Sequence, residues 1–483
     1  MSPMSFGTRG ARRWRRACDE GLDPFASQKL AERRLIGRDT RSFYGFGCHM
    51  MGSAAPLPRA WRVYAVSNFI SQIGTWMQST AQAWLVLELT GSSKLLGLLV
   101  AIQYLPAVIL AIPAGKVADR WGRRNLLLSG QAAMAILAGG LAAIVAAGNA
   151  TYPVLAGFAL LLGVGNALSQ PARIAMAATL AGGEGAGAHG RVRAAGMATL
   201  SFNLARVLGP ALAGFAIAAY GPTFAFAVNA VSFLPLLLFL ACMDADDRAS
   251  SSRRGSGRAA FGLLWTNVST RIPLLTVIVA GVFAINVQTL VPAYARLGLG
   301  LDAGGFGLLM GAFGAGACLG GFLQWRRPAV SIWRPLAAAT GLGLCLAALS
   351  ATHQFPLASL ILMGFGVCSA TVLSSASAAV QRFVPDHLRN AATALQVTIV
   401  LGTNPLGSAL TGWMIELFGL NGGSAVLGAA TLAAVMALAL THRLHAVGAP
   451  NLVRRGLGQK LPLAPSTAAV GAVIRSEGTE KDL

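Results

Sequence analysis

The sequence predicts an all-α membrane protein with twelve transmembrane helices in two six-helix bundles, and three observations lead to this prediction. Hydrophobic residues make up 55% of the 483 residues and charged residues only 11%, with a mean hydropathy of +0.61, whereas soluble domains carry about 25% charged residues. Apolar runs of the length that crosses a bilayer, about 20 residues, recur between breaks of Gly, Pro and charge. The longest internal break divides these runs into six and six.

The spans follow from the apolar runs in chain order. The first six are predicted at 62–89, 95–118, 125–147, 152–180, 192–219 and 222–243. The second six are predicted at 272–294, 304–325, 332–351, 355–382, 391–418 and 421–442. The domains expected around them are a basic cytosolic tail at 1–58, a first bundle at 59–243, a cytoplasmic linker at 244–270, a second bundle at 271–443 and a cytosolic tail at 444–483. Residues 1–58 form either a disordered tail or the product of a translation start placed too early, because Met50 and Met51 lie just before the first span.

The net charge of +21 is concentrated in alternate loops. Basic residues gather before the first span, between spans 2 and 3, in the central break and between spans 8 and 9, while the opposite loops offer only Lys94 and Arg296. This is the positive-inside pattern, so both termini and the linker are expected in the cytoplasm. No motif interleaves aromatic residues with these charges, and nucleic acid is therefore not an expected partner.

The sequence shows no arrangement typical of an enzyme or a cofactor site. The six cysteines are scattered without a CxxC pair, and the histidines lack metal-ligand spacing. There is no Walker loop and no polar catalytic cluster. We therefore expect no enzymatic activity, no catalytic residues, no cofactor and no metal site.

A tight, arginine-rich loop is predicted between spans 2 and 3, where the chain reads Gly-Lys-Val-Ala-Asp-Arg-Trp-Gly-Arg-Arg. Its glycines permit a tight turn, and its arginines hold the loop at an anionic membrane face. A topology signal made only of basic residues is the alternative, but it leaves the single acid and the glycine spacing unexplained. The candidates for a gating loop are Gly115, Asp119, Arg120, Gly122, Arg123 and Arg124.

This string between two hydrophobic helices resembles the loop between helices 2 and 3 of major facilitator superfamily transporters. In that family, the resemblance implies, the loop latches the two halves on the cytoplasmic side and gates alternating access.

Span 5 carries small residues every four positions, at Ala205, Gly209 and Ala213, so that a neighbouring helix can pack close. Pro210 removes a backbone donor and favours a bend. The string resembles the signature of major facilitator antiporters, which implies an exporter, although ordinary small-residue packing explains part of it. The candidates on this helix are Asn203, Arg206, Gly209, Pro210 and Gly214.

Arg206 is taken as the only basic residue well inside a predicted span, and burial of its charge requires a partner or an aqueous cavity. It would attract an anionic substrate, tune a proton-carrying acid, or pair structurally with an acid or a helix end. These alternatives stay open at this point.

The two halves of the chain repeat faintly. A shift of 198 residues aligns Arg191 with Arg389, Gly209 with Gly407, Gly214 with Gly412 and Gly221 with Gly419. Paired six-helix halves with substrate between them are a common transporter design.

Polar residues at three- and four-residue steps form a stripe on one face of span 1, which is expected to line a water-filled pathway or to meet another helix. Trp76 and Trp84 add stacking surface, with Trp84 expected as an interfacial anchor. Polar residues of the same kind occur on spans 4, 7 and 11. For each of them a hydrogen bond between helices is the alternative to contact with substrate. The candidates for the substrate pathway are Asn68, Gln72, Thr75, Trp76, Gln78, Ser79, Asn166, Gln170, Asn286, Gln396 and Asn404.

Glu88 and Glu416 lie near the outer ends of spans 1 and 11 and are the candidates for proton coupling. A buried carboxylate can take up and release a proton, whereas an acid at a helix end is often only solvated.

Residues 60–440 resemble the major facilitator branch that contains the enterobactin exporter and macrolide-type efflux proteins. The likeness lies in residues 61–131, in 166–173 and in 203–214. It implies a monomeric transporter of the bacterial inner membrane that exports a small organic molecule, a siderophore or an amphiphilic drug, by proton antiport and alternating access. Arg206 favours an anionic or catecholate compound. An uptake permease of the same fold and a non-transporting membrane sensor are the alternatives.

Overall fold

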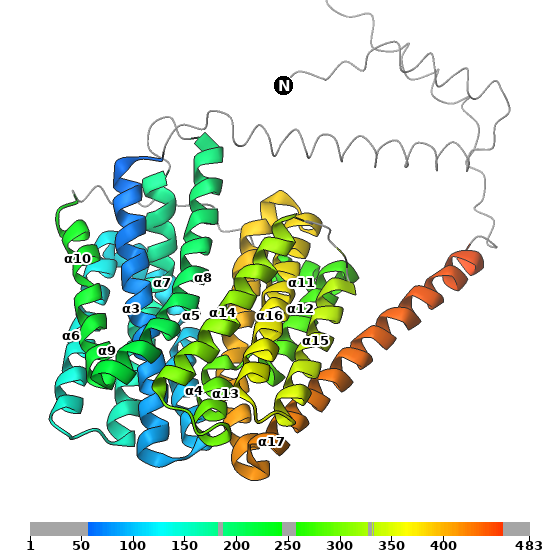
Figure 1. The fold of residues 1–483 in the computed structure, drawn as a ribbon. Coiled ribbons are helices and arrows are strands. Elements are labelled where there is room, and N and C mark those ends of the chain that lie inside the picture. Colours follow the sequence, from blue (N-terminus) through cyan, green and yellow to red (C-terminus); the bar gives the residue numbers. More distant parts are fainter. Residues whose placement is uncertain (1–56, 182–186, 244–256, 327–330, 332, 457–483) are drawn as a thin grey trace, which may run out of the picture.

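The computed structural model describes residues 57–181, 187–243, 257–326, 331 and 333–456, and all regular structure within them is helical. These helices form twelve passes that lie side by side in two groups (Figure 1). The first group consists of α3 (Arg59–Thr90), α4 (Ser93–Ile109) continued by α5 (Ala111–Trp121), α6 (Arg123–Ala146), α7 (Tyr152–Ala181), α8 (Gly187–Tyr220), and α9 (Pro222–Ser232) continued by α10 (Leu234–Ala241).

The second group begins with a short helix that precedes its first pass. It consists of α11 (Gly257–Thr266), α12 (Val268–Phe283) continued by α13 (Val287–Ala293) and the π-helical turn η1 (Tyr294–Gly298), α14 (Ala303–Arg326), α15 (Trp333–Ser350), α16 (Phe355–Phe383) and α17 (Asp386–Gly456). The last helix contains two passes, because the chain reverses at Gly419, where φ is 70°.

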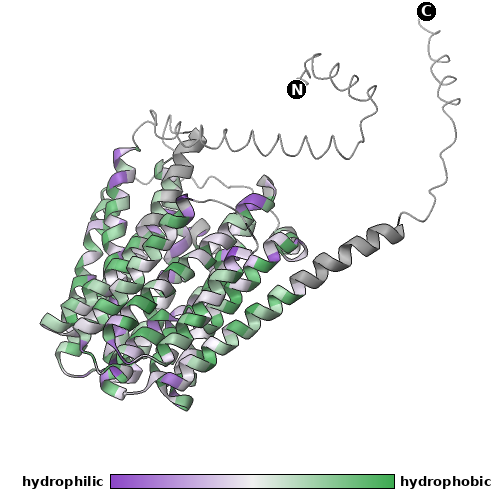
Figure 2. Cartoon of the chain, turned by 45° about the vertical axis from the view of Figure 1, so that its right-hand side comes forward, coloured by the Kyte–Doolittle hydropathy of each residue, from purple (hydrophilic) through white to green (hydrophobic). Residues whose placement is uncertain are grey.

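Composition alone marks fewer spans than the packing does. Seven helical segments of the described residues are long and apolar enough to cross a membrane. One of them, Ala391–Thr441, holds both passes of α17, whereas the polar α3 and the broken α4–α5 pass are not among the seven. Figure 2 shows apolar residues over the sides of both groups, as lipid contact requires.

Three segments differ from the sequence prediction. Residues 115–124 form no ten-residue loop: α5 continues through Trp121, α6 begins at Arg123, and Gly122 alone makes the turn with φ 79°, a value that favours glycine. Gly115 is therefore helical and takes no part in the turn. The predicted linker 244–270 contains α11, because Ala260 and Leu264 pack on the second bundle.

The predicted C-terminal tail 444–483 begins inside a helix, since α17 extends to Gly456. Residues 1–56 and 457–483 lie outside the described residues, so the tail assignments remain predictions.

The two groups touch at the end where α3 finishes and α4 begins, which is called the closed end below. Gly97 of α4 faces Gly412 of α17, and Gly214 of α8 faces Gly307 of α14, each so closely that an added Cβ would overlap the opposite backbone. Figure 1 shows the ribbons of the two groups together at this lower end and apart at the upper one. The small residues predicted on span 5 thus permit close helix packing.

The 198-residue repeat corresponds to equivalent contacts in the structure. Gly209 packs on Trp76 and Ile73 of the first pass of its bundle, and Gly407 packs on Gly281 and Asn286 of the first pass of its own bundle. Equivalent glycines therefore serve equivalent helix contacts in the two halves.

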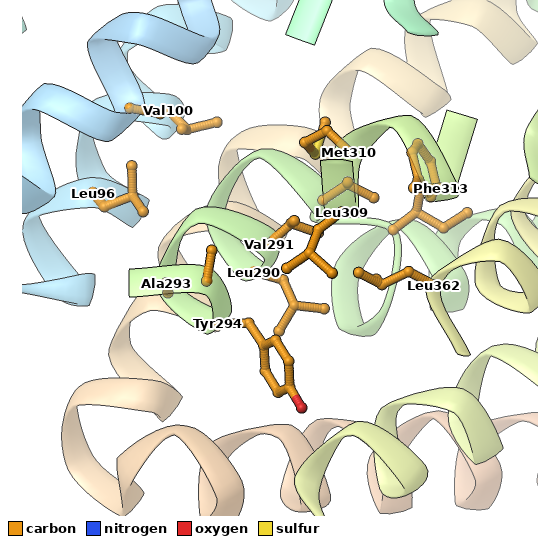
Figure 3. Close-up of a cluster of buried hydrophobic side chains, with 14 of the residues drawn as sticks. Leu96, Val100, Leu290, Val291, Ala293, Tyr294, Leu309, Met310, Phe313 and Leu362 are labelled. Atoms are coloured by element: carbon orange, nitrogen blue, oxygen red, sulfur yellow. The ribbon is translucent and has the colours of Figure 1, made fainter. Parts of the chain in front are cut away.

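The largest apolar core also crosses between the bundles. Leu96 and Val100 of α4 point toward α13, where Leu290 and Val291 are fully buried (Figure 3). Tyr294 anchors this region by donating its hydroxyl hydrogen bond to the carbonyl of Thr352.

Replacing Gly412 by Ala is expected to destabilise the closed end, because overpacking a tight contact costs about 1–3 kcal/mol and a methyl group here would overlap Ser93 and Gly97. The measurement is thermal unfolding in detergent, together with transport rate.

Gly402→Ala is the matched control, since it lies on the same helix with nothing within 4 Å of the added Cβ. It is expected to be neutral or slightly stabilising. Equal unfolding temperatures for the two variants would contradict the importance of the glycine contact.

Candidate functional site

A cavity of about 140 Å³ lies between the two bundles and is the candidate site. It is called the central cavity below. The first bundle contributes Trp76, Tyr104 and Arg206, while the second contributes Asn286 and Asn404 together with apolar side chains. Pockets for drug-sized ligands enclose about 300–1,000 Å³, so a ligand of that size would require the bundles to move apart.

The helix break between α12 and α13 places polar groups at this cavity. Residues 284–286 are not helical, and Asn286 has φ −102° and ψ 50°. The backbone recovers its hydrogen bonds locally, since Ile285 donates to the carbonyl of Ala280 and Asn286 donates to that of Ala284. Interrupted helices are tolerated at membrane depth only where they are buried in protein or line a cavity, and both conditions are met here.

Arg206 projects from α8 into the central cavity and is half-buried. Its Cζ lies 5.7 Å from the ring centroid of Trp76, a cation–π arrangement. Trp76 is held in turn by an edge-on contact with Phe202, at 6.0 Å between ring centroids. Tyr104 lies beside Arg206 and Gln288. Of the predicted site residues, Trp76, Arg206, Pro210, Asn286 and Asn404 are brought together at this cavity.

Most of the polar stripe of α3 does not line a pathway but forms hydrogen bonds to other helices of the same bundle. Gln78 accepts a hydrogen bond from Asn229 of α9, and Ser71 donates to Gln131 of α6. Ser79 alone among these reaches across the bundles, where it accepts from Gln288 Nε2 at 3.0 Å and donates to Gln103. The stripe therefore mainly ties α3 into its own bundle.

The remaining pathway candidates do not line the central cavity. Thr75 donates to the backbone carbonyl of Ser71, and Gln396 donates to Ser377. Three further candidates, Asn68, Asn166 and Gln170, are half-buried, and Gln72 is buried. None of these six is among the residues that line the cavity.

Trp84 is buried, with 1% of its surface exposed, and is not the interfacial anchor that the sequence suggested. Its ring stacks on Phe306 of the second bundle at 5.3 Å, and Arg296 lies over it at 5.5 Å. The tryptophan thus joins the bundles at the closed end, because its ring packs on Phe306 of the other bundle and not at the membrane surface.

The arginines that follow Gly122 bind within the first bundle. Arg123 donates to Thr179 of α7 at 2.9 Å, and Arg124 donates to the carbonyls of Leu240 and Ala241 at 2.8 and 3.0 Å. Arg124 thereby satisfies carbonyls at the C-terminal end of α10. Arg120 is exposed.

The side chains of Asp119 and Asn203 lie outside the described residues, although the helices that carry them are described. Their roles remain predictions.

Sequence reasoning missed two polar residues inside the membrane-spanning helices, of which Tyr104 lines the cavity. Arg173 of α7 is 9% exposed, so Arg206 is not the only basic residue inside a span; the backbone carbonyl of Arg173 accepts from Tyr64 at 2.9 Å. Tyr104 stands in an apolar run as a lone hydroxyl beside Gln103, which is the one sequence signal that marked it.

The two proton-coupling candidates are both exposed, but they differ in their hydrogen bonds. Glu88 is exposed at the end of α3. Glu416 Oε2 accepts hydrogen bonds from Ser92 Oγ and Ser93 Oγ, both at 3.1 Å, and from the backbone N–H of Lys94 at 3.3 Å. A carboxylate of α17 thus caps the N-terminus of α4, where negative charge is favoured.

Lys94 adds a second contact between the same two helices, with its Nζ 5.8 Å from the ring centroid of Trp413. The cap and this cation–π contact together form what is called the closed-end latch below.

Among the described residues, no three His, Cys, Asp or Glu side chains gather into a metal-binding group.

The comparison with known families assigns the chain. Residues 51–465 match the family described as transmembrane secretion effector, within the major facilitator superfamily. The chain belongs to this family. It is therefore a multi-pass membrane transporter rather than an enzyme, in agreement with the sequence prediction.

Relatives and solved structures agree with this assignment. The chain is 25% identical to the multidrug efflux pump Tap of Mycolicibacterium fortuitum over 367 residues, which is 72% of this chain and 87% of Tap. The nucleoside transporter NupG superposes with a TM-score of 0.61 at 14% identity, covering 79% of this chain and 99% of NupG. A bacterial homologue of the human lysosomal transporter Spinster, inward-facing and unoccupied, gives 0.62 at 15% identity, covering 79% and 94%. These structures show the major facilitator fold.

Replacing Glu416 by Gln is expected to loosen the closed-end latch, because an uncharged amide oxygen is a weaker acceptor for three donors than a carboxylate. Spin labels at Tyr220 and Leu297, exposed positions on opposite bundles, would report the separation in a background without native cysteines. The expected result is a larger population with long label distances.

Asp302→Asn is the matched control, because it neutralises an exposed carboxylate at the same end that accepts only a local hydrogen bond, from Gly305. Unchanged distance distributions in Glu416→Gln, or equal changes in both variants, would show that the cap does not hold the bundles together.

Proposed function

We propose that this protein exports a small organic molecule, a siderophore or an amphiphilic drug, by alternating access. The observation that carries the proposal is the central cavity between two bundles that are latched at one end. Membership in a secretion effector family and the 25% identity to the efflux pump Tap support the outward direction. The small residues at Ala205, Gly209 and Ala213 match the antiporter-like pattern and support it further.

The orientation follows from the basic loops. Arg120, Arg123 and Arg124 lie at the end opposite the closed end, which the positive-inside rule places in the cytoplasm. The conformation is then inward-facing, with the central cavity reached by substrate from the cytoplasm. Release outside requires the closed-end latch and the glycine contacts to separate while the opposite ends of the bundles meet.

Proton antiport is the proposed energy source. The three acidic side chains that the structure describes, Glu88, Asp302 and Glu416, all lie at the closed end, and none lines the cavity. In the inward-facing state Glu416 is already engaged with α4, so its bonding favours a role in holding the gate. Asp119 beside the turn at Gly122 is the proposed acid of the opposite gate, and Glu88 remains the candidate carrier.

The test is efflux from cells that express the chain, against a panel of siderophores and drugs, with and without a protonophore. Export of one compound should collapse with the protonophore, since an antiporter loses its driving force when the proton gradient is lost. A second assay measures uptake into everted membrane vesicles. Their cytoplasmic face points outward, so uptake there corresponds to export from cells. If neither assay detects export of any compound, although the protein is shown to be folded in the membrane, the export function is refuted.

Asp119→Asn is expected to slow efflux by about tenfold, because gate interactions couple conformations by about 1–3 kcal/mol. Asp302→Asn is the control: Asp302 is exposed and accepts a hydrogen bond from the N–H of Gly305, which asparagine also accepts. Equal efflux in both variants would remove Asp119 from the gate.

A further inference from the structure

We propose that the central cavity selects organic anions, and that the Arg206 guanidinium is the group that recognises their charge. This inference rests on the proposed transport function and narrows its substrate to a compact amphiphile with one carboxylate or comparable acidic group. The observation behind it is a charged side chain that faces the cavity with no acid in the lining to neutralise it.

The charge balance of the cavity is one-sided. Arg206 is the one charged residue among those that line it, and the three described carboxylates lie at the closed end. A positive charge at membrane depth is costly unless it is paired or hydrated. A bound anion would form an ion pair with Arg206. A cationic compound would be repelled by the guanidinium, and the cavity lining has no carboxylate to offset that repulsion.

The geometry leaves the guanidinium available. It lies against the face of Trp76, at 5.7 Å, and beside Tyr104, and the cation–π contact holds the group through the ring face. A guanidinium carries five N–H donors in its own plane, in the fork that binds a carboxylate through two oxygens. Trp76 thus positions the charge without occupying the donors that would bind the anion.

The rest of the lining indicates the remainder of the molecule. Met310, Phe313 and Leu401 offer apolar and aromatic contacts, and the cavity encloses about 140 Å³. Asn286 is 3% exposed, and its side-chain Oδ1 is buried without a hydrogen-bond partner. This oxygen lies against Gly407 of α17 and is closed off from the cavity, so it does not define the ligand. The cavity therefore fits an aromatic or apolar body with an acidic group.

The test uses three probes of the same shape and different charge: 2-hydroxybenzoate, the neutral 2-hydroxybenzamide and the cationic 2-hydroxybenzylamine. Binding to the full chain in lipid nanodiscs is measured by equilibrium dialysis. The benzoate is expected to bind about tenfold more tightly than the benzamide, because hydrogen bonds to charged groups contribute more than neutral ones. The amine is expected to bind most weakly.

Arg206→Gln is expected to bring the benzoate and the benzamide to equal affinity, and Arg206→Lys to retain part of the preference. Arg296→Gln is the matched control, because it removes an arginine that lies over a tryptophan at nearly the same distance, 5.5 Å, at the exposed closed end. It should leave the preference unchanged.

The outcomes separate this inference from the transport function. Equal binding of the three probes by the unmodified chain, preferred binding of the amine, or a preference that survives Arg206→Gln in folded protein would each overturn the anion site. The probe series on the unmodified chain decides the matter even if the variants do not fold. Preserved anion selectivity without transport in either direction would instead overturn the exporter and leave the binding site in place.

Discussion

Close backbone contact between helices of different bundles is the constraint on which this structure depends. In lipid, apolar side chains gain little by leaving one apolar environment for another, so association depends on close packing and on polar contacts. The pairs Gly97–Gly412 and Gly214–Gly307 bring the backbones together at the closed end. The cap on α4 by Glu416 and the stacking of Trp84 on Phe306 act at the same end. Because these contacts are confined to one end, the bundles can hinge about the cavity.

The polar side chains inside the membrane divide into two kinds with different consequences. One kind bonds between helices of a single bundle, as with Gln78 and Asn229 or Ser71 and Gln131. The other kind lines the central cavity, as Arg206, Tyr104 and Asn286 do. Hydrogen bonds between helices hold a bundle together, while a polar group that lines a cavity can meet a ligand. The helix break between α12 and α13 also lies at this cavity, where its backbone groups are surrounded by protein and not by lipid.

The order of the helices could be predicted closely from the sequence because apolar length is dictated by the bilayer. Spans predicted at 152–180, 304–325 and 355–382 lie within one or two residues of α7, α14 and α16. The turn at 115–124 was predicted too long, since local composition could not show that Gly122 alone reverses the chain. Within the site, Arg206, Asn286 and Asn404 could be selected because polarity inside an apolar run is visible in sequence. Met310 and Phe313 could not, because their types are equally common in a packed core, and only the neighbouring Gln103 marked Tyr104.

The sequence by itself determined that this chain spans a membrane many times, in two related halves, with its basic residues concentrated in alternate loops. These properties depend on composition and on spacing along the chain, because each segment enters the bilayer or stays outside it according to its own composition. Only the tertiary structure decided which polar residues of α3 bond to neighbours and that Glu416 caps a helix 322 residues away at Lys94. It also decided that Trp84 is buried between bundles and that Arg206 faces a cavity without an acid. Such outcomes depend on which faces of distant helices meet, and a helix face has no partner until the whole bundle is assembled.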